Sequence, residues 1–209
     1  MEPIDVDHLS QRLATLGERG RTICAIAGAP GSGKSTLAER LVELLDVAAP
    51  GLAALLPMDG FHYDDLYLVP AGLRPRKGAP ETFDVGGLRH TLLRLRANNE
   101  DTVAVPVFDR DIEIARAGAR LIPSSVRVIV AEGNYLLLRH APWDSLLPHF
   151  DTTVMVEVPE AELRARLRRR WEGYGLTEDE IAWKLDGNDL PNGRLVASES
   201  AQAQFVVRP

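Results

Sequence analysis

The segment most clearly suited to chemistry is Gly28-Ala-Pro-Gly-Ser-Gly-Lys-Ser35, which fits the pattern G-x-x-x-x-G-K-[ST] in full. Glycines in such a loop let backbone N–H groups turn toward an anion, and the following helix N-terminus adds a partial positive charge. The lysine reaches the β- and γ-phosphates, and the hydroxyl after it binds Mg²⁺. The pattern therefore predicts a site for ATP and Mg²⁺. The residues expected to form it are Gly28, Ala29, Pro30, Gly31, Ser32, Gly33, Lys34, Ser35 and Thr36.

Two acids each close an apolar run that is typical of a buried strand. Asp59 follows Leu52–Met58, where a carboxylate would face the γ-phosphate and could accept a proton from a hydroxyl acceptor. Glu132 follows Val128–Ala131, and we expect it to hold Mg²⁺ together with Ser35. A turn-forming acid is the alternative for each position. The sequence also leaves open which of the two acts as the base.

The long stretch 60–81 has no clear hydrophobic period, and it is rich in aromatic residues, Pro, Gly and Arg. A loop of this length is usually functional or disordered. Its side chains suit a polar acceptor that is either anionic or rich in hydroxyl groups, and a purely structural role is the alternative. The acceptor-contacting candidates from this stretch and from the end of the next strand are Asp59, His62, Tyr63, Lys77, Asp109 and Arg110.

An arginine-rich helix is predicted over about 160–172. Arg166 and Arg170 lie one turn apart on the same face, and we expect them to neutralise charge on the transferring phosphoryl group. Arg164 and Arg168 are expected on a solvated face. Binding of nucleic acid by this helix is disfavoured, because the chain has a formal net charge of -6.

Strands and helices alternate along the chain, which predicts an α/β fold with a mostly parallel sheet covered on both faces. We expect one domain over residues 1–209, a three-layer α/β/α sandwich of the P-loop NTPase type with a helical lid at about 160–190. An irregular stretch with a small hairpin is expected over 109–123. The predicted strands are 21–27, 52–58, 102–108, 126–131, 152–158 and 204–207, and the predicted helices are 5–18, 35–46, 84–97, 160–172 and one that begins after Thr177.

Composition narrows the classes of partner. The chain has 209 residues, 45% of them hydrophobic, and a single cysteine, which excludes an internal disulfide. No apolar run is long enough to insert into a membrane, and the acidic N-terminus does not look like a signal peptide. We therefore expect a cytoplasmic protein that acts on a small molecule and not on nucleic acid. The oligomeric state is open, with a homodimer among the alternatives.

The order of these motifs resembles the group formed by uridine kinases, phosphoribulokinases and pantothenate kinases. The likeness spans roughly residues 20 to 205, and it is strongest to bacterial fructose transport system kinases. Besides the phosphate loop, the motifs that carry the resemblance are Asp59-Gly-Phe, Lys77-Gly-Ala-Pro-Glu-Thr-Phe-Asp84, Pro106-Val-Phe-Asp109, Glu132-Gly-Asn-Tyr135 and the arginine helix.

The resemblance implies roles for several residues. Asp59 matches the catalytic base of the group, Glu132 the acid of the central strand, and Arg166 the lid arginine of pantothenate kinases. Asn192 matches an asparagine that contacts pantothenate there.

Two departures weaken a pyrimidine-nucleoside substrate. Gly78 stands where uridine kinases carry an acid that grips the ribose, and Glu113 stands where they carry a histidine.

The leading hypothesis is a kinase that moves the γ-phosphoryl group to a hydroxyl of a small metabolite: a sugar such as fructose, pantothenate or a nucleoside-like compound. A nucleotide-dependent regulator or binding module without a small-molecule acceptor is the alternative. The two differ in whether ATP turnover rises when a hydroxyl compound is added. A kinase-like protein without activity is disfavoured, because every phosphate-handling position is filled.

Overall fold

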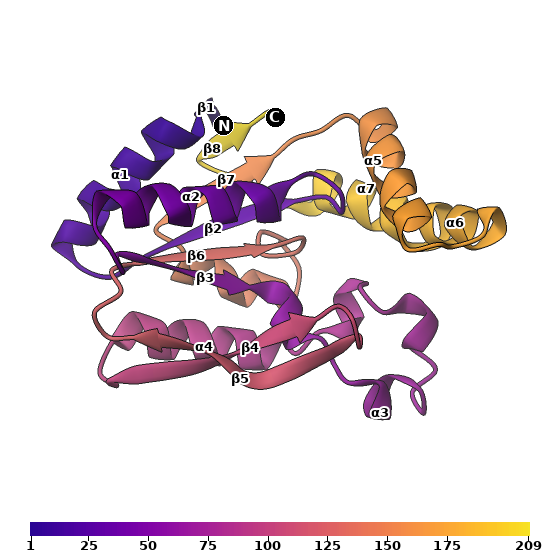
Figure 1. Ribbon diagram of the computed structural model, residues 1–209, viewed down its shortest axis with the longest axis horizontal. Helices are drawn as coiled ribbons and strands as arrows, with labels where there is room; N and C mark the ends of the chain where they lie inside the picture. Colours follow the sequence, from indigo (N-terminus) through magenta and orange to yellow (C-terminus); the bar gives the residue numbers. More distant parts are fainter.

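The computed structural model describes residues 1–209, and its centre is one six-stranded parallel sheet (Figure 1). The strand order is β1-β8-β7-β2-β6-β3. The parallel α/β arrangement predicted from the sequence is therefore confirmed. The strands are β1 (Glu2–Pro3), β2 (Thr22–Gly28), β3 (Ala53–Pro57), β6 (Val128–Gly133), β7 (Thr152–Val156) and β8 (Phe205–Val207).

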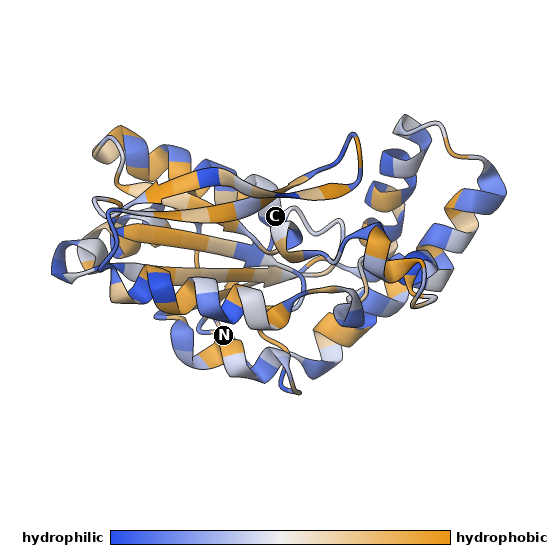
Figure 2. Ribbon diagram, turned by 90° about the horizontal axis from the view of Figure 1, so that it is seen from below, coloured by the Kyte–Doolittle hydropathy of each residue, from blue (hydrophilic) through white to orange (hydrophobic).

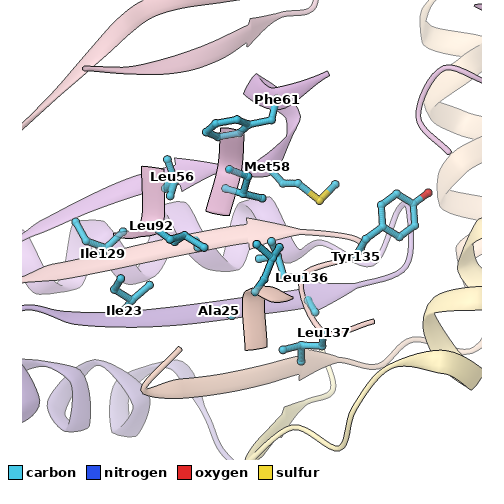
Figure 3. Close-up of a cluster of buried hydrophobic side chains, with 14 of the residues drawn as sticks. Ile23, Ala25, Leu56, Met58, Phe61, Leu92, Ile129, Tyr135, Leu136 and Leu137 are labelled. Atoms are coloured by element: carbon cyan, nitrogen blue, oxygen red, sulfur yellow. The ribbon is translucent and has the colours of Figure 1, made fainter. Parts of the chain in front are cut away.

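Two hydrophobic clusters lie on the two faces of this sheet. Alternate residues of β2 belong to different clusters, because successive side chains of a strand point to opposite faces of the sheet. Ile23 and Ala25 join the larger cluster, part of which is drawn in Figure 3, whereas Cys24 and Ile26 join the second cluster. Helices α1 (Val6–Arg19) and α2 (Lys34–Ala48) cover the second cluster, and α4 (Val85–Ala97) and η4 (Trp143–His149) pack on the larger one.

Figure 2 shows the resulting pattern: the strands of the sheet are mostly hydrophobic, and the helices carry mixed stripes. None of the helices combines the length and the apolar character needed to cross a lipid bilayer.

A separate two-stranded antiparallel sheet is formed by β4 (Thr102–Asp109) and β5 (Ile114–Pro123). The strand at 102–108 was expected, and 109–123 was expected to hold an irregular stretch with a small hairpin. A hairpin is present, but the irregular part of that expectation was wrong, because β5 runs from Ile114 to Pro123. The reason is that β5 is largely exposed, so its sequence carries little of the hydrophobic alternation that reveals a strand. The hairpin brings residues 110–113 to the same end of the molecule as the phosphate loop.

The stretch after β3 is a chain of short helical turns. These are η1 (Met58–Phe61), α3 (Asp65–Leu68), η2 (Arg74–Arg76) and η3 (Pro80–Thr82). The helix that follows begins where the sequence predicted, because the Asp84 side chain accepts a hydrogen bond from the N–H of Gly87.

A helical unit stands beyond the carboxyl ends of the strands, across from α3 (Figure 1). It consists of α5 (Glu160–Gly173), α6 (Glu178–Lys184), the π-helical turn η5 (Leu185–Asp189) and α7 (Leu190–Glu199). The predicted capping box at Thr177 and Glu180 is present at the start of α6. A small third cluster holds the unit together, and it consists of Leu163, Leu167, Ile181, Leu185 and Leu190.

Candidate active site

The predicted phosphate loop connects β2 to α2, and its glycines have backbone geometry that other residues adopt only under strain. Gly31 and Gly33 have φ values of +78° and +88°, in the left-handed region. A Cβ atom on Gly31 would also come within 2.9 Å of Leu167 Cγ on α5. Glycine is therefore needed in this loop for two reasons: the backbone turn, and the close approach to α5, the first helix of the predicted lid.

Lys34, at the start of α2, lies close enough to the buried Glu132 for their opposite charges to interact. Residue 132 lies on β6 directly opposite Ile26 of β2, and its carboxylate accepts a hydrogen bond from Ser35 Oγ at 3.2 Å. Burial raises the pKa of Glu132, and the charge of Lys34 opposes that rise. Burial likewise lowers the pKa of Lys34, and Glu132 and Asp59 oppose that fall. The three charges thus share one low-dielectric site.

Asp59 sits just beyond the end of β3, whose Pro57 is opposite Glu132 in the sheet. Arg110, from the turn between β4 and β5, donates a hydrogen bond from Nη2 to Asp59 Oδ2 at 2.6 Å. Burial alone would raise the pKa of Asp59, but His62, Arg110 and Lys34 outweigh it and hold that pKa below its ordinary value. Asp59 is therefore ionised at neutral pH.

Lys34, Ser35, Asp59 and Arg110 open onto one cavity of about 730 Å³. Its walls come from the phosphate loop, the turns after β3, the β4–β5 hairpin and the lid helices. Of the residues predicted from the sequence, those that line it are Pro30, Gly31, Gly33, Lys34, Ser35, Thr36, Asp59, His62, Lys77, Arg110, Arg166, Arg170 and Asn192. The fold thus brings residues from positions 30 to 192 into one space.

The other predicted residues lie outside the lining. Glu132 is behind Ser35 and is 5% exposed. Asp109 accepts a hydrogen bond from Arg116 at 2.6 Å, and the ring of Tyr63 packs against Tyr67. Ala29 lines a second cavity. A Cβ atom on Gly28 would lie only 2.6 Å from the buried Ser32 Oγ, so these two residues shape the loop from behind.

The arginines of α5 lie on different faces of the helix, as the sequence predicted. Arg166 donates to the carbonyl of Ser32 at 3.2 Å, so it touches the phosphate loop directly. Arg170 stacks over the Trp171 ring at the cavity wall. Arg164 and Arg168 form exposed ion pairs with acids outside the cavity. Only one face of the helix therefore presents arginines to the site.

Sequence reasoning missed a set of polar contacts at the base of the lid. Trp171 Nε1 donates to Asp189 at 2.7 Å, and Asn192 Nδ2 donates to Asn188 Oδ1 at 3.0 Å. Asn188 Nδ2 in turn donates to the carbonyl of Lys77 at 3.3 Å. The one signal in the sequence was Asn188-Asp-Leu-Pro-Asn192, but nothing in it indicated that η5 is a π-helical turn, a feature that often marks functional sites.

The two positions that depart from uridine kinases both line the cavity. Gly78 has a φ of +101°, and its carbonyl accepts a hydrogen bond from the Tyr135 hydroxyl at 2.6 Å. Glu113 has a φ of +56°, and its carbonyl accepts a hydrogen bond from Lys77 Nζ at 2.6 Å. At both positions the backbone carbonyl, and not the side chain, fixes the surrounding loop.

A second cavity of about 910 Å³ lies next to the phosphate loop and shares Pro30 and Asp189 with the first. Its walls come from the loop between β7 and α5, from α7 and from the end of the chain. The apolar residues among them include Ala29, Val156, Val158, Leu163, Leu190 and Val196.

Comparison with known proteins identifies relatives that match nearly the whole chain. No protein-family model matches the chain. It is 35% identical over 202 residues to the uncharacterised protein YggC of Escherichia coli, covering 96% of this chain and 83% of the relative. It is 32% identical over 201 residues to a Schizosaccharomyces pombe protein named "Putative uridine kinase", covering 92% and 85%.

A solved structure agrees with these sequence relatives. It is described as a "putative fructose transport system kinase" from a Silicibacter species, and it is 42% identical to this chain with a TM-score of 0.87. The match covers 97% of this chain and 98% of that one.

Proposed function

The chain belongs to the P-loop kinases of the uridine kinase and pantothenate kinase group, and on that premise we propose that it transfers the γ-phosphoryl group of ATP to a hydroxyl of a small metabolite. The observation that carries this proposal is the position of Asp59. Its carboxylate opens onto the same cavity as Lys34 and the lid arginines, whereas Glu132 is enclosed behind Ser35. A base must reach the proton it accepts, and of these two acids Asp59 is the one that lines the cavity.

The phosphate loop and the lid bind the triphosphate. Lys34 at the start of α2 meets the β- and γ-phosphates together with the loop N–H groups. Arg166 and Arg170 approach from α5, and they stabilise the charge that spreads over the γ-phosphoryl oxygens during transfer. The acceptor hydroxyl lies between this group and Asp59, which takes its proton as the new O–P bond forms.

Two protein groups beside the phosphate loop, the Ser35 hydroxyl and the Glu132 carboxylate, are suited to bind Mg²⁺. No cluster of three or more His, Cys, Asp or Glu side chains is present that could hold a metal alone. Mg²⁺ commonly uses one or two protein oxygens and completes its shell with water and substrate phosphates. Ser35 Oγ and the carboxylate of Glu132 provide such a pair. When bound there, the ion neutralises charge on the phosphates.

The second cavity suits the adenine base. Residues 29 and 30 of the phosphate loop separate this second cavity from the first one, which is lined by Asp59. A triphosphate bound on the loop would therefore extend toward the second cavity. Its aliphatic walls, which include Val158 and Leu163, can cover the flat faces of a purine.

We place this reaction in the cytoplasm, and we take the substrate to be a free small molecule. The formal net charge of -6 disfavours a nucleic-acid substrate. A homodimer is compatible with the proposal and is not needed for it, because both cavities are formed within one chain.

The experiment that tests the proposal compares ADP release by wild type and Asp59→Asn, with MgATP and a panel of sugars, pantothenate and nucleosides. An active acceptor should raise wild-type turnover several-fold, and Asp59→Asn should lower the acceptor-dependent rate by about 100-fold or more while MgATP still binds. Asp111→Asn removes an exposed carboxylate near the hairpin turn and is the matched control. Full acceptor-dependent turnover by Asp59→Asn would rule out the assigned base.

A further inference from the structure

The charged side chains around the main cavity differ in how they are paired. Near the phosphate loop, Arg170 and Lys184 form no ion pair. They flank the ring of Trp171 instead, with the charged groups 5.2 Å and 5.1 Å from its centre. This end of the cavity therefore presents positive charge that a triphosphate would neutralise.

The other end of the main cavity, which we call the acceptor end, is formed by the turns after β3 and by the β4–β5 hairpin. Its cations Arg74, Lys77 and Arg110 each have a carboxylate partner. Arg74 Nε and Lys77 Nζ donate to the two oxygens of Asp65 at 2.6 Å and 2.7 Å. Arg110 is paired with Asp59. The three cations Arg74, Lys77 and Arg110 are thus all paired, the first two with Asp65 and the third with Asp59.

The rest of the wall at the acceptor end consists of aromatic side chains and one side-chain amide. The ring of His62 lies between Phe83 and Phe108, with centroids 4.0 Å and 4.7 Å away. Burial holds the pKa of His62 below its ordinary value, so this ring adds no charge at neutral pH. The amide residue Asn134 completes this wall.

We propose that the acceptor is an uncharged polyhydroxylated compound, such as a free sugar or a sugar-like alcohol. This inference rests on the proposed kinase function and narrows its substrate. A carboxylate or phosphate at this end would find each of these cations already paired, and it would have to compete with Asp65 or Asp59 for it. Hydroxyl groups instead exchange hydrogen bonds with ion pairs and amides that are already in place, and the aromatic rings cover the apolar face of a sugar.

The first test uses wild-type enzyme with matched neutral and anionic compounds. The pairs are fructose and fructose 1-phosphate, panthenol and pantothenate, and uridine and uridine monophosphate. In any pair that supports ADP release, kcat/KM should be about tenfold or more higher for the neutral member, the cost of one poorly paired charge. A preference for the anionic member would overturn the inference and leave the kinase function standing.

The second test does not depend on knowing the acceptor. Inorganic phosphate is titrated calorimetrically into protein saturated with Mg²⁺ and a non-hydrolysable ATP analogue. Wild type should bind no phosphate at millimolar concentration, whereas Asp65→Asn, which frees Arg74 and Lys77, should bind it. Asp111→Asn, which removes an acid that forms no ion pair, should behave as wild type.

The outcomes of this second test separate the two proposals. Phosphate binding by wild type would overturn the inference, and absence of binding by Asp65→Asn would count against the charge-balance argument. Failure of the ATP analogue to bind would instead contradict the kinase function itself.

Discussion

The two carboxylates that face Lys34 have pKa values displaced in opposite directions. Burial raises the pKa of Glu132, whereas the cations around Asp59 overcome burial and lower its pKa. Asp59 therefore keeps its charge to a lower pH than Glu132 does. This difference in pKa, together with the access of Asp59 to the cavity, supports the proposal that Asp59 is the base and that Glu132 helps to hold a cation.

Arg110 is the one side chain that pairs directly with Asp59, so its removal should change the pH profile. In Arg110→Gln the pKa of Asp59 should rise, because a cation that favours the ionised form is gone. Turnover requires the ionised form, so the acidic limb of kcat/KM for the acceptor should move to higher pH.

Arg110→Lys retains the charge and is the matched control, whose acidic limb should stay closer to that of wild type. The measurement is kcat/KM against pH at saturating MgATP. An acidic limb at the same pH in wild type and Arg110→Gln would mean that this pair does not set the charge of Asp59.

At the scale of elements, the phosphate loop and the lid helix α5 approach each other so closely that their geometry is shared. The loop carries no Cβ at Gly31, which is where Leu167 approaches. Leu167 belongs to the small cluster that holds the lid together. A change in the loop should therefore reach the lid.

Gly31→Ala and Gly51→Ala form a matched pair for testing this contact. Both glycines have left-handed backbones, with φ of +78° and +75°, but a Cβ at position 51 would meet nothing within 4 Å. Each variant should lose about 1 kcal/mol of unfolding free energy from backbone strain. Only Gly31→Ala should also weaken MgATP binding, by about tenfold, because Cβ crowds Leu167.

Calorimetry gives the affinities, and thermal unfolding gives the stabilities. Equal nucleotide affinity in the two variants would show that loop and lid do not share this contact.

Some elements were predictable from sequence because their signals are local. The cap of α4 at Asp84 and the capping box of α6 at Thr177 depend on residues within one turn, and both helices begin where these signals predicted. The phosphate loop is likewise contiguous. The exposed strand β5 and the turns after β3 carry no such local pattern, so their conformations depend on tertiary contacts.

The lid-base contacts illustrate the same limit for the site. Trp171 meets Asp189 across 18 positions, and Asn188 meets Lys77 across 111, through folding that no local motif encodes. Lys34 was predictable because it belongs to a contiguous motif, and Asp59 because it lies just past the end of a strand of a parallel sheet, where ligands bind.

At the scale of the whole molecule, the site lies between parts of unequal stability. The sheet carries a hydrophobic cluster on each face, of 26 and 13 buried residues, whereas the lid is held by a cluster of only five. Less buried apolar area means a smaller free energy of local opening. We therefore expect the unit of α5, α6, η5 and α7 to open more readily than the sheet.

Amide hydrogen exchange should show this difference. Without nucleotide, α6 should exchange much faster than β2 and β6, and MgATP should slow exchange in α5 and α6 through contacts with Arg166 and Arg170. Helix α1 lines neither cavity and provides an internal reference whose exchange should change little. Protection of α6 equal to that of β2, with or without nucleotide, would contradict a lid that opens.

The central claim is that the phosphoryl group leaves ATP for a hydroxyl of a second molecule, and the most direct test follows both products of one reaction. Wild-type protein is incubated with MgATP and an acceptor that stimulates turnover, and ADP and phosphorylated acceptor are quantified by mass spectrometry. The account predicts that the two form in equal amounts. ADP that appears with free phosphate alone, at a rate indifferent to every hydroxyl compound, would contradict it and would favour a nucleotide-dependent regulator.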